Sequence, residues 1–255
     1  GAASKAKEAK EAKDDDEEDE QPLAEGLMDF SNLGRTVDGT GLAYRSLACV
    51  GKRIGVTKAI LPYTHLLTID LSKNLIKDPA PLKSLPNLVM LKLADNSIST
   101  LKSWESEEEP PFQFLVELDL SGNNLPALLP LPMKALKHAS FARNDIATCA
   151  EFGGHEKLES LDLSEQRQSK ITSLDGVAGM PALTSLNVSC NELEGLNGLA
   201  DLPALQDLKL SGNKFQELEG PWADLAELKS LDLANCQLAV PKPLEVLRNL
   251  PKLRK

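Results

Sequence analysis

Residues 183–204 read LTSLNVSCNELEGLNGLADLPA, and this stretch contains the pattern that decides the fold. Apolar side chains alternate toward its start at Leu183, Leu186 and Val188, and Asn191 follows before the next leucine. As a motif, the stretch is L-x-x-L-x-L-x-x-N-x-L. The alternating L-x-L part is typical of a short strand, because successive strand side chains point to opposite faces. The leucines that follow at three-residue spacing favour a 3₁₀ or short α turn that returns the chain.

The motif recurs along the whole chain at a nearly constant period. Its first leucine is found at Leu66, Leu88, Leu115, Leu136, Leu158, Leu183, Leu205 and Leu228, and a ninth repeat would open at Leu253. The spacings of 21–27 residues are those of a leucine-rich repeat. One such repeat buries too little apolar surface to offset the entropy of ordering it, so neighbouring repeats must stack. We therefore predict an α/β repeat fold, a leucine-rich-repeat solenoid with a curved parallel sheet on the concave face and short 3₁₀ or α turns on the convex face.

One polar position of each repeat is expected to hold the stack together. Where the chain turns off the strand, an amide side chain can hydrogen-bond the backbone groups that the turn leaves free. Cysteine is a known substitute for asparagine at this position. The predicted structural ladder is Asn74, Asn96, Asn123, Asn144, Gln166, Asn191, Asn213 and Cys236.

Composition and charge exclude several classes of function. The 255 residues include 28 Lys and Arg against 38 Asp and Glu, for a net charge of −10. An acidic chain with no basic block is a poor candidate for binding nucleic acid. No apolar run approaches the roughly 18 residues of a membrane span, and no signal peptide is visible. The four cysteines match no zinc or disulfide pattern, which favours reduced thiols in the cytoplasm.

The chain is expected to contain three segments. Residues 1–21 are predicted to be a disordered acidic tail, because seven consecutive acidic residues repel one another. Residues 22–65 are predicted to form an N-terminal cap and a degenerate repeat. Residues 66–255 hold eight repeats and the start of a ninth, with no visible cap at the end. Within the N-terminal cap, a helix-like spacing is shared by Leu23, Leu27, Met28 and Phe30.

Two repeats are longer than the others. The second carries the acidic, proline-containing stretch Ser103–Pro111. Its Trp104 is either an exposed residue of a contact loop or is packed under that loop. The fifth repeat has three extra residues beside Gln166. Insertions of this kind are expected to form loops.

No set of residues indicates catalysis. The three histidines, His65, His138 and His155, form no recognisable group with serine or cysteine in the sequence. No glycine loop matches a phosphate-binding motif, and no metal-ligand spacing occurs. We therefore predict a chain without enzymatic activity, metal, cofactor or small-molecule substrate.

The concave face is the remaining candidate for a functional site. The first three strands carry apolar outward residues where later strands carry polar ones, and an exposed apolar cluster usually marks a contact site. The alternative is that the N-terminal segment or the acidic loop covers this cluster, and that His138 is an ordinary exposed imidazole. The predicted protein-binding residues are Leu67, Val89, Met90, Lys92, Val116, Asp119, His138, Asp162, Lys209 and Asp232.

Three segments resemble a known family. Residues 39–44 (GTGLAY), 139–144 (ASFARN) and 155–161 (HEKLESL) are similar to segments of the leucine-rich-repeat subunit of ciliary radial spokes. The resemblance implies a non-enzymatic structural subunit of the axoneme, located in the cilium or flagellum, that binds other radial-spoke subunits and supports motility. The 22-residue spacing also resembles the repeats of the type-1 protein phosphatase regulatory subunit and of outer-arm dynein light chain. A regulatory adaptor of a phosphatase, or another axonemal subunit such as a dynein light chain, is therefore the alternative.

Overall fold

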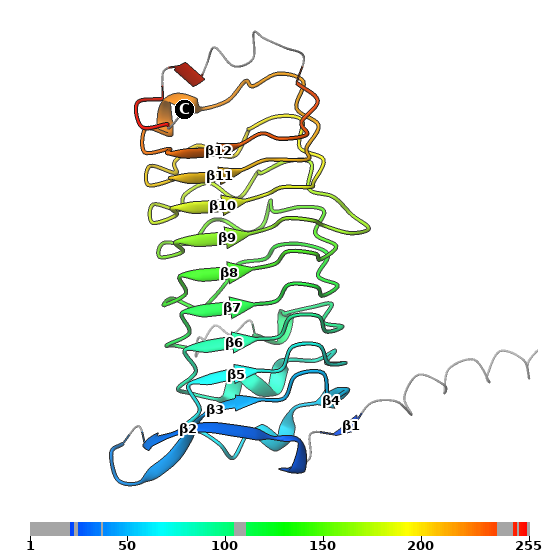
Figure 1. Ribbon diagram of the computed structural model, residues 1–255, viewed down its shortest axis with the longest axis vertical. Helices are drawn as coiled ribbons and strands as arrows, with labels where there is room; N and C mark the ends of the chain where they lie inside the picture. The colour runs from blue at the N-terminus through cyan, green and yellow to red at the C-terminus, as the bar shows by residue number, and fades with distance from the viewer. Residues whose placement is uncertain are drawn as a thin grey trace, which may run out of the picture.

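A computed structural model describes residues 21–22, 25–36, 38–104, 111–238, 247–248 and 250–253. The acidic tail expected over residues 1–21 falls almost wholly outside the described residues, as do the acidic residues 105–110 of the lengthened second repeat. Figure 1 shows the described residues as a stack of short, roughly parallel strands, each followed by a segment that returns the chain to the next strand.

The strands form one ten-stranded sheet in the order β12-β11-β10-β9-β8-β7-β6-β5-β3-β2. All neighbours pair in parallel except β2 and β3, which are antiparallel. A further pair, β1 (Gln21–Pro22) with β4 (Ile54–Val56), is separate from this sheet. The strands of the large sheet are β2 (Asp29–Arg35), β3 (Leu42–Ala48), β5 (Thr68–Asp70), β6 (Met90–Lys92), β7 (Glu117–Asp119), β8 (His138–Ser140), β9 (Ser160–Asp162), β10 (Ser185–Asn187), β11 (Asp207–Lys209) and β12 (Ser230–Asp232).

The register of the sheet follows the repeat. Equivalent positions of neighbouring repeats pair with one another, as Leu186 does with Leu161 and Leu208. In β5 to β11 the middle residue of each strand is buried, whereas the residues on either side of it are at least partly exposed. We call the surface formed by these flanking residues and by the residue just before each strand the sheet face. The alternation read from L-x-L therefore places one side of each strand in the core and the other toward solvent.

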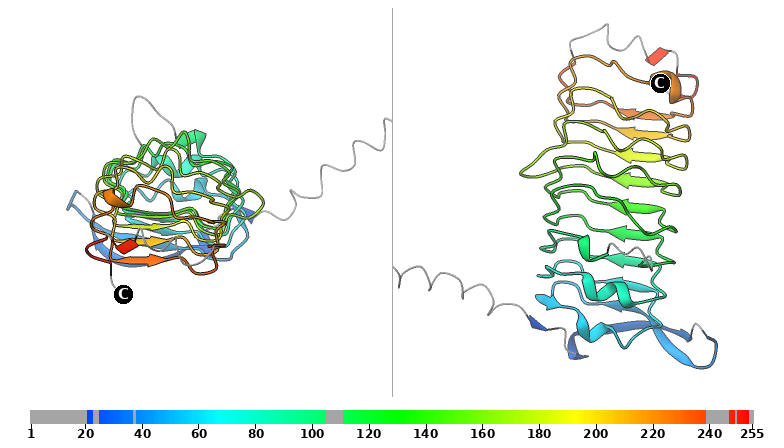
Figure 2. Two further views of the ribbon diagram at one scale, coloured as in Figure 1. Left: turned by 90° about the horizontal axis from the view of Figure 1, so that it is seen from above. Right: turned by 180° about the vertical axis from the view of Figure 1, so that it is seen from behind.

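The core lies between the sheet and the return segments, which the view along the stack shows on opposite sides (Figure 2). It is built mainly of leucine, and the first leucine of all eight repeats is fully buried. The helical turns of the described residues are all 3₁₀ turns of three to five residues: η1 (Glu25–Leu27), η2 (Lys58–Ile60), η3 (Ala80–Ser84), η4 (Lys102–Trp104) and η5 (Trp222–Asp224). The predicted leucine-rich-repeat solenoid is confirmed.

The N-terminal cap differs from the helix-like segment that the leucine spacing predicted. Among the described residues between 25 and 48, the helical segment is the short turn η1, and β2 and β3 form a β-hairpin. The hairpin adds an antiparallel strand to the first edge of the sheet and so satisfies backbone groups that would otherwise be free there. Phe30 lies in this hairpin, and its ring packs 5.4 Å from Tyr44 and 4.6 Å from Tyr63 between ring centres. Phe30 therefore packs from a strand of the hairpin and not from a helix.

Of the two alternatives for Trp104, the structure shows the packed one, and the possible contact-loop role is wrong. Its side chain is only 1% exposed, and its ring lies edge-on to Phe112 with 4.9 Å between the ring centres. Its indole N–H donates a hydrogen bond of 3.1 Å to the backbone carbonyl of Pro79, in the preceding repeat. Trp104 thus fills the core beneath the lengthened repeat, because burial of a large ring with a satisfied N–H is favourable.

Candidate protein-binding face

A row of buried amide side chains lies along the edge where the strands end. Asn123 represents it: its Nδ2 donates to the carbonyls of Leu93 (2.9 Å), Leu120 (3.0 Å) and Ser121 (3.3 Å). Its Oδ1 accepts the backbone N–H of Ile98 at 3.0 Å. Each such side chain therefore joins its own turn to the preceding repeat and fixes the spacing of the strands. Equivalent bonds are made by Asn74, Asn96, Asn144, Asn191 and Asn213.

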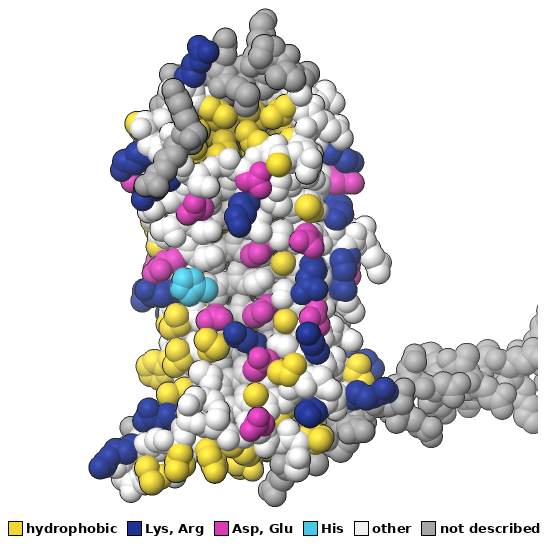
Figure 3. Space-filling view, in the orientation of Figure 1, with side chains coloured by type: hydrophobic (Ala, Val, Ile, Leu, Met, Phe, Trp, Pro, Cys, Tyr) yellow, Lys and Arg dark blue, Asp and Glu magenta, His cyan; other side chains and the backbone are white. Residues whose placement is uncertain are grey.

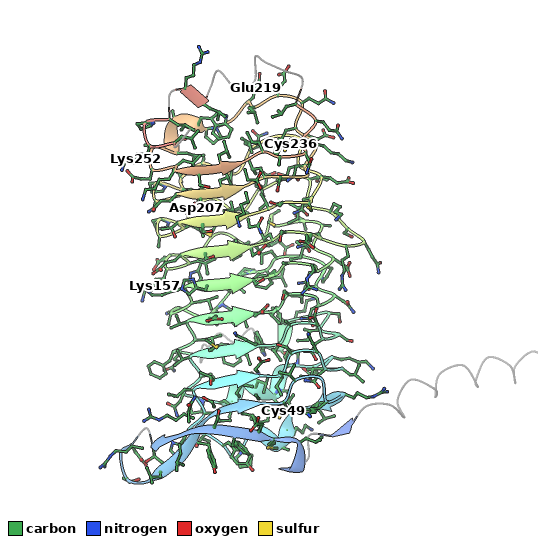
Figure 4. All side chains as sticks on the ribbon, in the orientation of Figure 1. Cys49, Lys157, Asp207, Glu219, Cys236 and Lys252 are labelled. Carbon is green, nitrogen blue, oxygen red and sulfur yellow. The ribbon has the colours of Figure 1, made fainter. Side chains whose placement is uncertain are left out.

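The two unusual residues of this row behave differently. Gln166 is fully buried and makes the same set of bonds as an asparagine, with Nε2 donating to the carbonyls of Phe141 and Leu163. Cys236, beyond the end of β12 (Figure 4), has no amide group, and its Sγ contacts the carbonyl of Leu210 at the longer distance of 3.4 Å. Burial raises the pKa of this thiol. The stack is therefore held less firmly at its last repeat than at Gln166.

The extra residues of the fifth repeat bind back onto the stack. The guanidinium of Arg167 donates to the carbonyl of Asn123 and to Oδ1 of Asn124, two repeats away. Nζ of Lys170 donates to the carbonyls of Gln166 and Cys190. The insertion is thus a loop, as the sequence predicts, but these two side chains face the edge of the solenoid.

The last residue of each strand from β5 to β12 forms a column on the sheet face, which we call the central column. In four strands this residue is an aspartate whose carboxylate accepts hydrogen bonds from the turn that follows the strand. Oδ1 of Asp119 accepts the backbone N–H and the hydroxyl of Ser121, at 2.9 and 2.6 Å. Asp162 accepts the same two bonds from Ser164. Asp70 and Asp232 each accept the backbone N–H two residues further on. The predicted contact residues Asp119, Asp162 and Asp232 therefore also stabilise the fold. The recurring D-L-S sequence was the available signal for this role, because a carboxylate commonly accepts an N–H two residues on.

Two ion pairs cross the strands of this face. Lys92 lies 3.7 Å from Glu117, and Lys137 lies 2.6 Å from Glu159. The hydrogen bond from Lys137 lowers the pKa of Glu159. His138, on β8, is exposed beside these pairs, and Lys209 is exposed on β11. Both pairs are open to solvent and each contributes little to stability.

The apolar residues predicted on the first strands lie next to one another. The backbone N–H of Val89 donates to the carbonyl of Leu67, and the N–H of Val116 donates to that of Val89, both at 2.8 Å. Val89 is 36% exposed, and Met90, Leu67 and Val116 are partly exposed. Sequence reasoning missed Phe114, which is 56% exposed just before the third repeat. It was missed because it precedes the first leucine of its repeat and so falls outside the strand pattern.

We call Leu67, Val89, Met90, Phe114 and Val116 together the apolar edge. Hydrophobic side chains gather where β5, β6 and β7 begin (Figure 3). In the later repeats the equivalent column is polar, with Lys137, Glu159, Thr184, Gln206 and Lys229. In this column, apolar side chains are therefore confined to the first three repeats.

A shallow hollow adjoins the apolar edge. Ser140 on β8 pairs with Asp119 on β7 and Asp162 on β9, so a short side chain lies between two carboxylates. The hollow is also lined by Glu117, His138 and Ser160. The structure thus brings together the predicted residues of β5 to β9, whereas Lys209 and Asp232 lie apart from them on β11 and β12.

No group of three or more His, Cys, Asp and Glu side chains among the described residues could hold a metal ion. Cys49 and Cys149 are buried, and burial raises the pKa of the Cys149 thiol to about 12. A protonated, inaccessible thiol is a poor nucleophile. None of the helices that the structure describes has the length and apolar character to cross a membrane.

Comparison with known proteins gives the same class as the fold. A sequence profile described as "Leucine rich repeat" matches residues 156–215 and 181–238, and a second matches residues 114–147. The chain is 31% identical over 156 residues to "Leucine-rich repeat-containing protein 23" of Bos taurus, an alignment that covers 60% of this chain and 37% of that protein. The aligned part therefore spans just over a third of the length of this relative.

Solved structures are similar over most of the chain. A chain in the "TLR13-ssRNA13 complex" has a TM-score of 0.64 and 28% identity, covering 76% of this chain and 30% of that one. A leucine-rich-repeat protein of Leptospira interrogans has a TM-score of 0.62 and 27% identity, covering 78% and 51%. The fold and these similarities define a leucine-rich-repeat solenoid. Such solenoids are typically non-enzymatic and generally act as scaffolds for protein interactions.

Proposed function

We propose that this chain is a non-enzymatic scaffold that binds other proteins through its sheet face, and that it serves as a structural subunit of the axonemal radial spoke. The observation that carries the binding role is the apolar edge, because side chains such as Val89 and Phe114 remain exposed at one end of an otherwise polar face. Exposed apolar patches of this kind usually mark contact sites on soluble proteins.

The radial-spoke assignment is supported by resemblance in sequence. Residues 39–44 span the end of the hairpin turn and the start of β3, and residues 139–144 run from β8 to the amide row. Both segments are parts of the frame on which the sheet face is built. The assignment places the chain in the cilium or flagellum, with other radial-spoke subunits as its partners.

Fractionation of isolated cilia from the source cell tests this proposal. The membrane is removed with detergent, the axonemes are washed with high salt, and the chain is quantified by mass spectrometry in every fraction. A spoke subunit remains in the axonemal pellet at a constant ratio to known spoke proteins. A soluble matrix protein, measured in the same fractions, is the control for incomplete extraction.

The opposite result is equally informative. Absence from cilia, or full release with the matrix control, contradicts the spoke assignment. If the chain is retained and its amount stays constant in axonemes of mutants that lack spokes, it would instead fit another axonemal complex. Reversible recovery with a phosphatase in the soluble fraction would favour a regulatory adaptor.

A further inference from the structure

We infer that the sheet face of β5 to β9 receives a basic amphipathic helix of a partner protein, which lies along the stack. Its apolar side chains contact the apolar edge, and its cationic side chains lie over the carboxylates of Asp70, Asp119 and Asp162. This inference rests on the proposed protein-binding role but not on the assembly to which the chain belongs.

The apolar half of the site follows from the geometry of the parallel sheet. Leu67, Val89 and Val116 occupy the same position in three successive repeats and are joined by backbone hydrogen bonds. Neighbouring strands lie about 4.8 Å apart, so these three side chains extend about 10 Å along the stack. Phe114, two residues before Val116, adds a ring that is 56% exposed. A strip of this length matches two turns of helix.

The central column next to the apolar strip is negatively charged, and this charge favours a basic partner. Lys92 on β6 is paired with Glu117, and Lys137, just before β8, is paired with Glu159. The aspartates of the central column instead accept backbone N–H groups through Oδ1, as Asp119 does from Ser121, and Oδ2 of Asp162 also accepts a hydrogen bond from Nδ2 of Asn187 at 3.2 Å. Their carboxylates are thus held in fixed orientation on a face where they outnumber the cations. Fixed carboxylates beside an apolar strip are complementary to cationic side chains.

The spacing of the carboxylates indicates a helix rather than a strand. Asp70, Asp119 and Asp162 occupy β5, β7 and β9, every second strand, so successive carboxylates are about 9.6 Å apart along the stack. Residues seven apart in an α-helix lie on one face and about 10.5 Å apart. Residues on one face of a strand repeat at about 6.8 Å, which does not match.

The hollow at Ser140 gives one cationic side chain a defined position. Ser140 lies between Asp119 and Asp162 in the central column, and its side chain is shorter than either of theirs. An arginine or lysine placed there would have a carboxylate on either side, with Glu117 and His138 at the rim.

Binding of a synthetic amphipathic peptide to the full chain tests the inference. The probe has about three heptads, with leucine at positions a and d and arginine at position e, and carries a fluorophore for anisotropy measurements. The control peptide has glutamate in place of arginine and the same leucines. We expect the arginine peptide to bind at least tenfold more tightly, and its affinity to fall as salt rises from about 50 to about 300 mM.

Matched variants locate the site. Val89→Lys with Val116→Lys is expected to weaken the arginine peptide at least tenfold, whereas Thr184→Lys with Gln206→Lys adds the same charge to the same column further along and should change it less than threefold. Asp119→Asn with Asp162→Asn keeps the oxygen that accepts the N–H and removes the charge, so it should weaken binding about tenfold. Asp201→Asn with Asp207→Asn, at two exposed aspartates outside the proposed site, is its control. Circular dichroism confirms that each variant is folded.

Equal binding of both peptides, or equal effects of a variant pair and its control, would overturn the inference. Absence of peptide binding would overturn it too. None of these results affects axonemal retention of the intact chain, so failure of the inference and failure of the proposed function are distinguishable.

Discussion

Oε1 of Gln166 accepts the backbone N–H of Ile146 at 3.0 Å, which is the bond that asparagine makes to the preceding repeat elsewhere in the solenoid. The longer side chain therefore replaces asparagine without loss of the ladder, even though three residues are inserted beside it. The solenoid is continuous across this lengthened repeat.

We predict that Gln166→Ala is strongly destabilising. The substitution leaves the carbonyls of Phe141 and Leu163 and the N–H of Ile146 without their partner in a buried position. Each unsatisfied buried group costs about 1–3 kcal/mol, so the free energy of unfolding should fall by about 3–5 kcal/mol in urea denaturation. The exposed Gln168→Ala is the control and should change it by less than about 0.5 kcal/mol. A loss below about 1 kcal/mol at Gln166 would contradict this role.

A second prediction concerns the residue just before the amide row. This position has a positive φ in every repeat, between 53° at Asp95 and 71° at Gly212. Lys73 has φ of 60°, a left-handed conformation that costs a residue with a Cβ about 1 kcal/mol. Lys73→Gly should therefore raise the free energy of unfolding by about 0.5–1 kcal/mol. Lys209→Gly, within strand β11, should lower it by a similar amount. If both variants lower the free energy of unfolding, glycine acts at both positions only by raising the entropy of the unfolded chain, and the prediction for Lys73 is contradicted.

The solenoid was predictable from the sequence because the leucines that recur with the repeat are also the residues that the core buries. The hairpin at β2 and β3 was not predictable from Leu27, Met28 and Phe30, because their spacing suits a helix as well as a strand. Pairing with the edge of the sheet, a tertiary interaction, decides between them. The burial of Trp104 depends on Phe112 and Pro79, which the turn geometry brings together.

The candidate site was predictable to a similar degree. Apolar residues at Leu67, Val89 and Val116 were visible because they occupy one repeat position. The capping bonds of Asp119 and Asp162 were not assigned, because they depend on how the chain turns after each strand. Phe114 lies outside the repeat pattern and only the structure places it beside Val116.

Trp104→Ala should lower the free energy of unfolding by about 3–5 kcal/mol, because a buried ring and its hydrogen bond to Pro79 are lost. Phe114→Ala, ten residues away on the surface, should cost less than about 1 kcal/mol. Thermal and urea unfolding of both variants measure the difference. Similar losses for the two would contradict the assignment of Trp104 to the core and Phe114 to the surface.

The hairpin turn should carry a pH dependence of its own. Hydrogen bonds from Thr36 and Thr40 lower the pKa of Asp38 to about 2. Since an unfolded aspartate has a pKa of about 3.9, ionisation of Asp38 stabilises the folded state. That contribution is fully present above about pH 4 and is lost as pH falls through about 2. Carboxyl NMR titration measures the pKa directly, and Asp38→Asn should remove this part of the acid sensitivity. A pKa near 3.9 would contradict the turn geometry.

The central claim is that the N-terminal part of the sheet face binds the chain to its partners. The most direct test is the retention of a tagged chain in detergent- and salt-washed axonemes, with Val89→Lys/Val116→Lys compared to Thr184→Lys/Gln206→Lys at equal expression. We predict that the wild-type chain and the second variant remain in the pellet, and that the first variant is released. Equal retention of both variants would contradict a role for the apolar edge in binding, and release of the wild-type chain would contradict axonemal assembly itself.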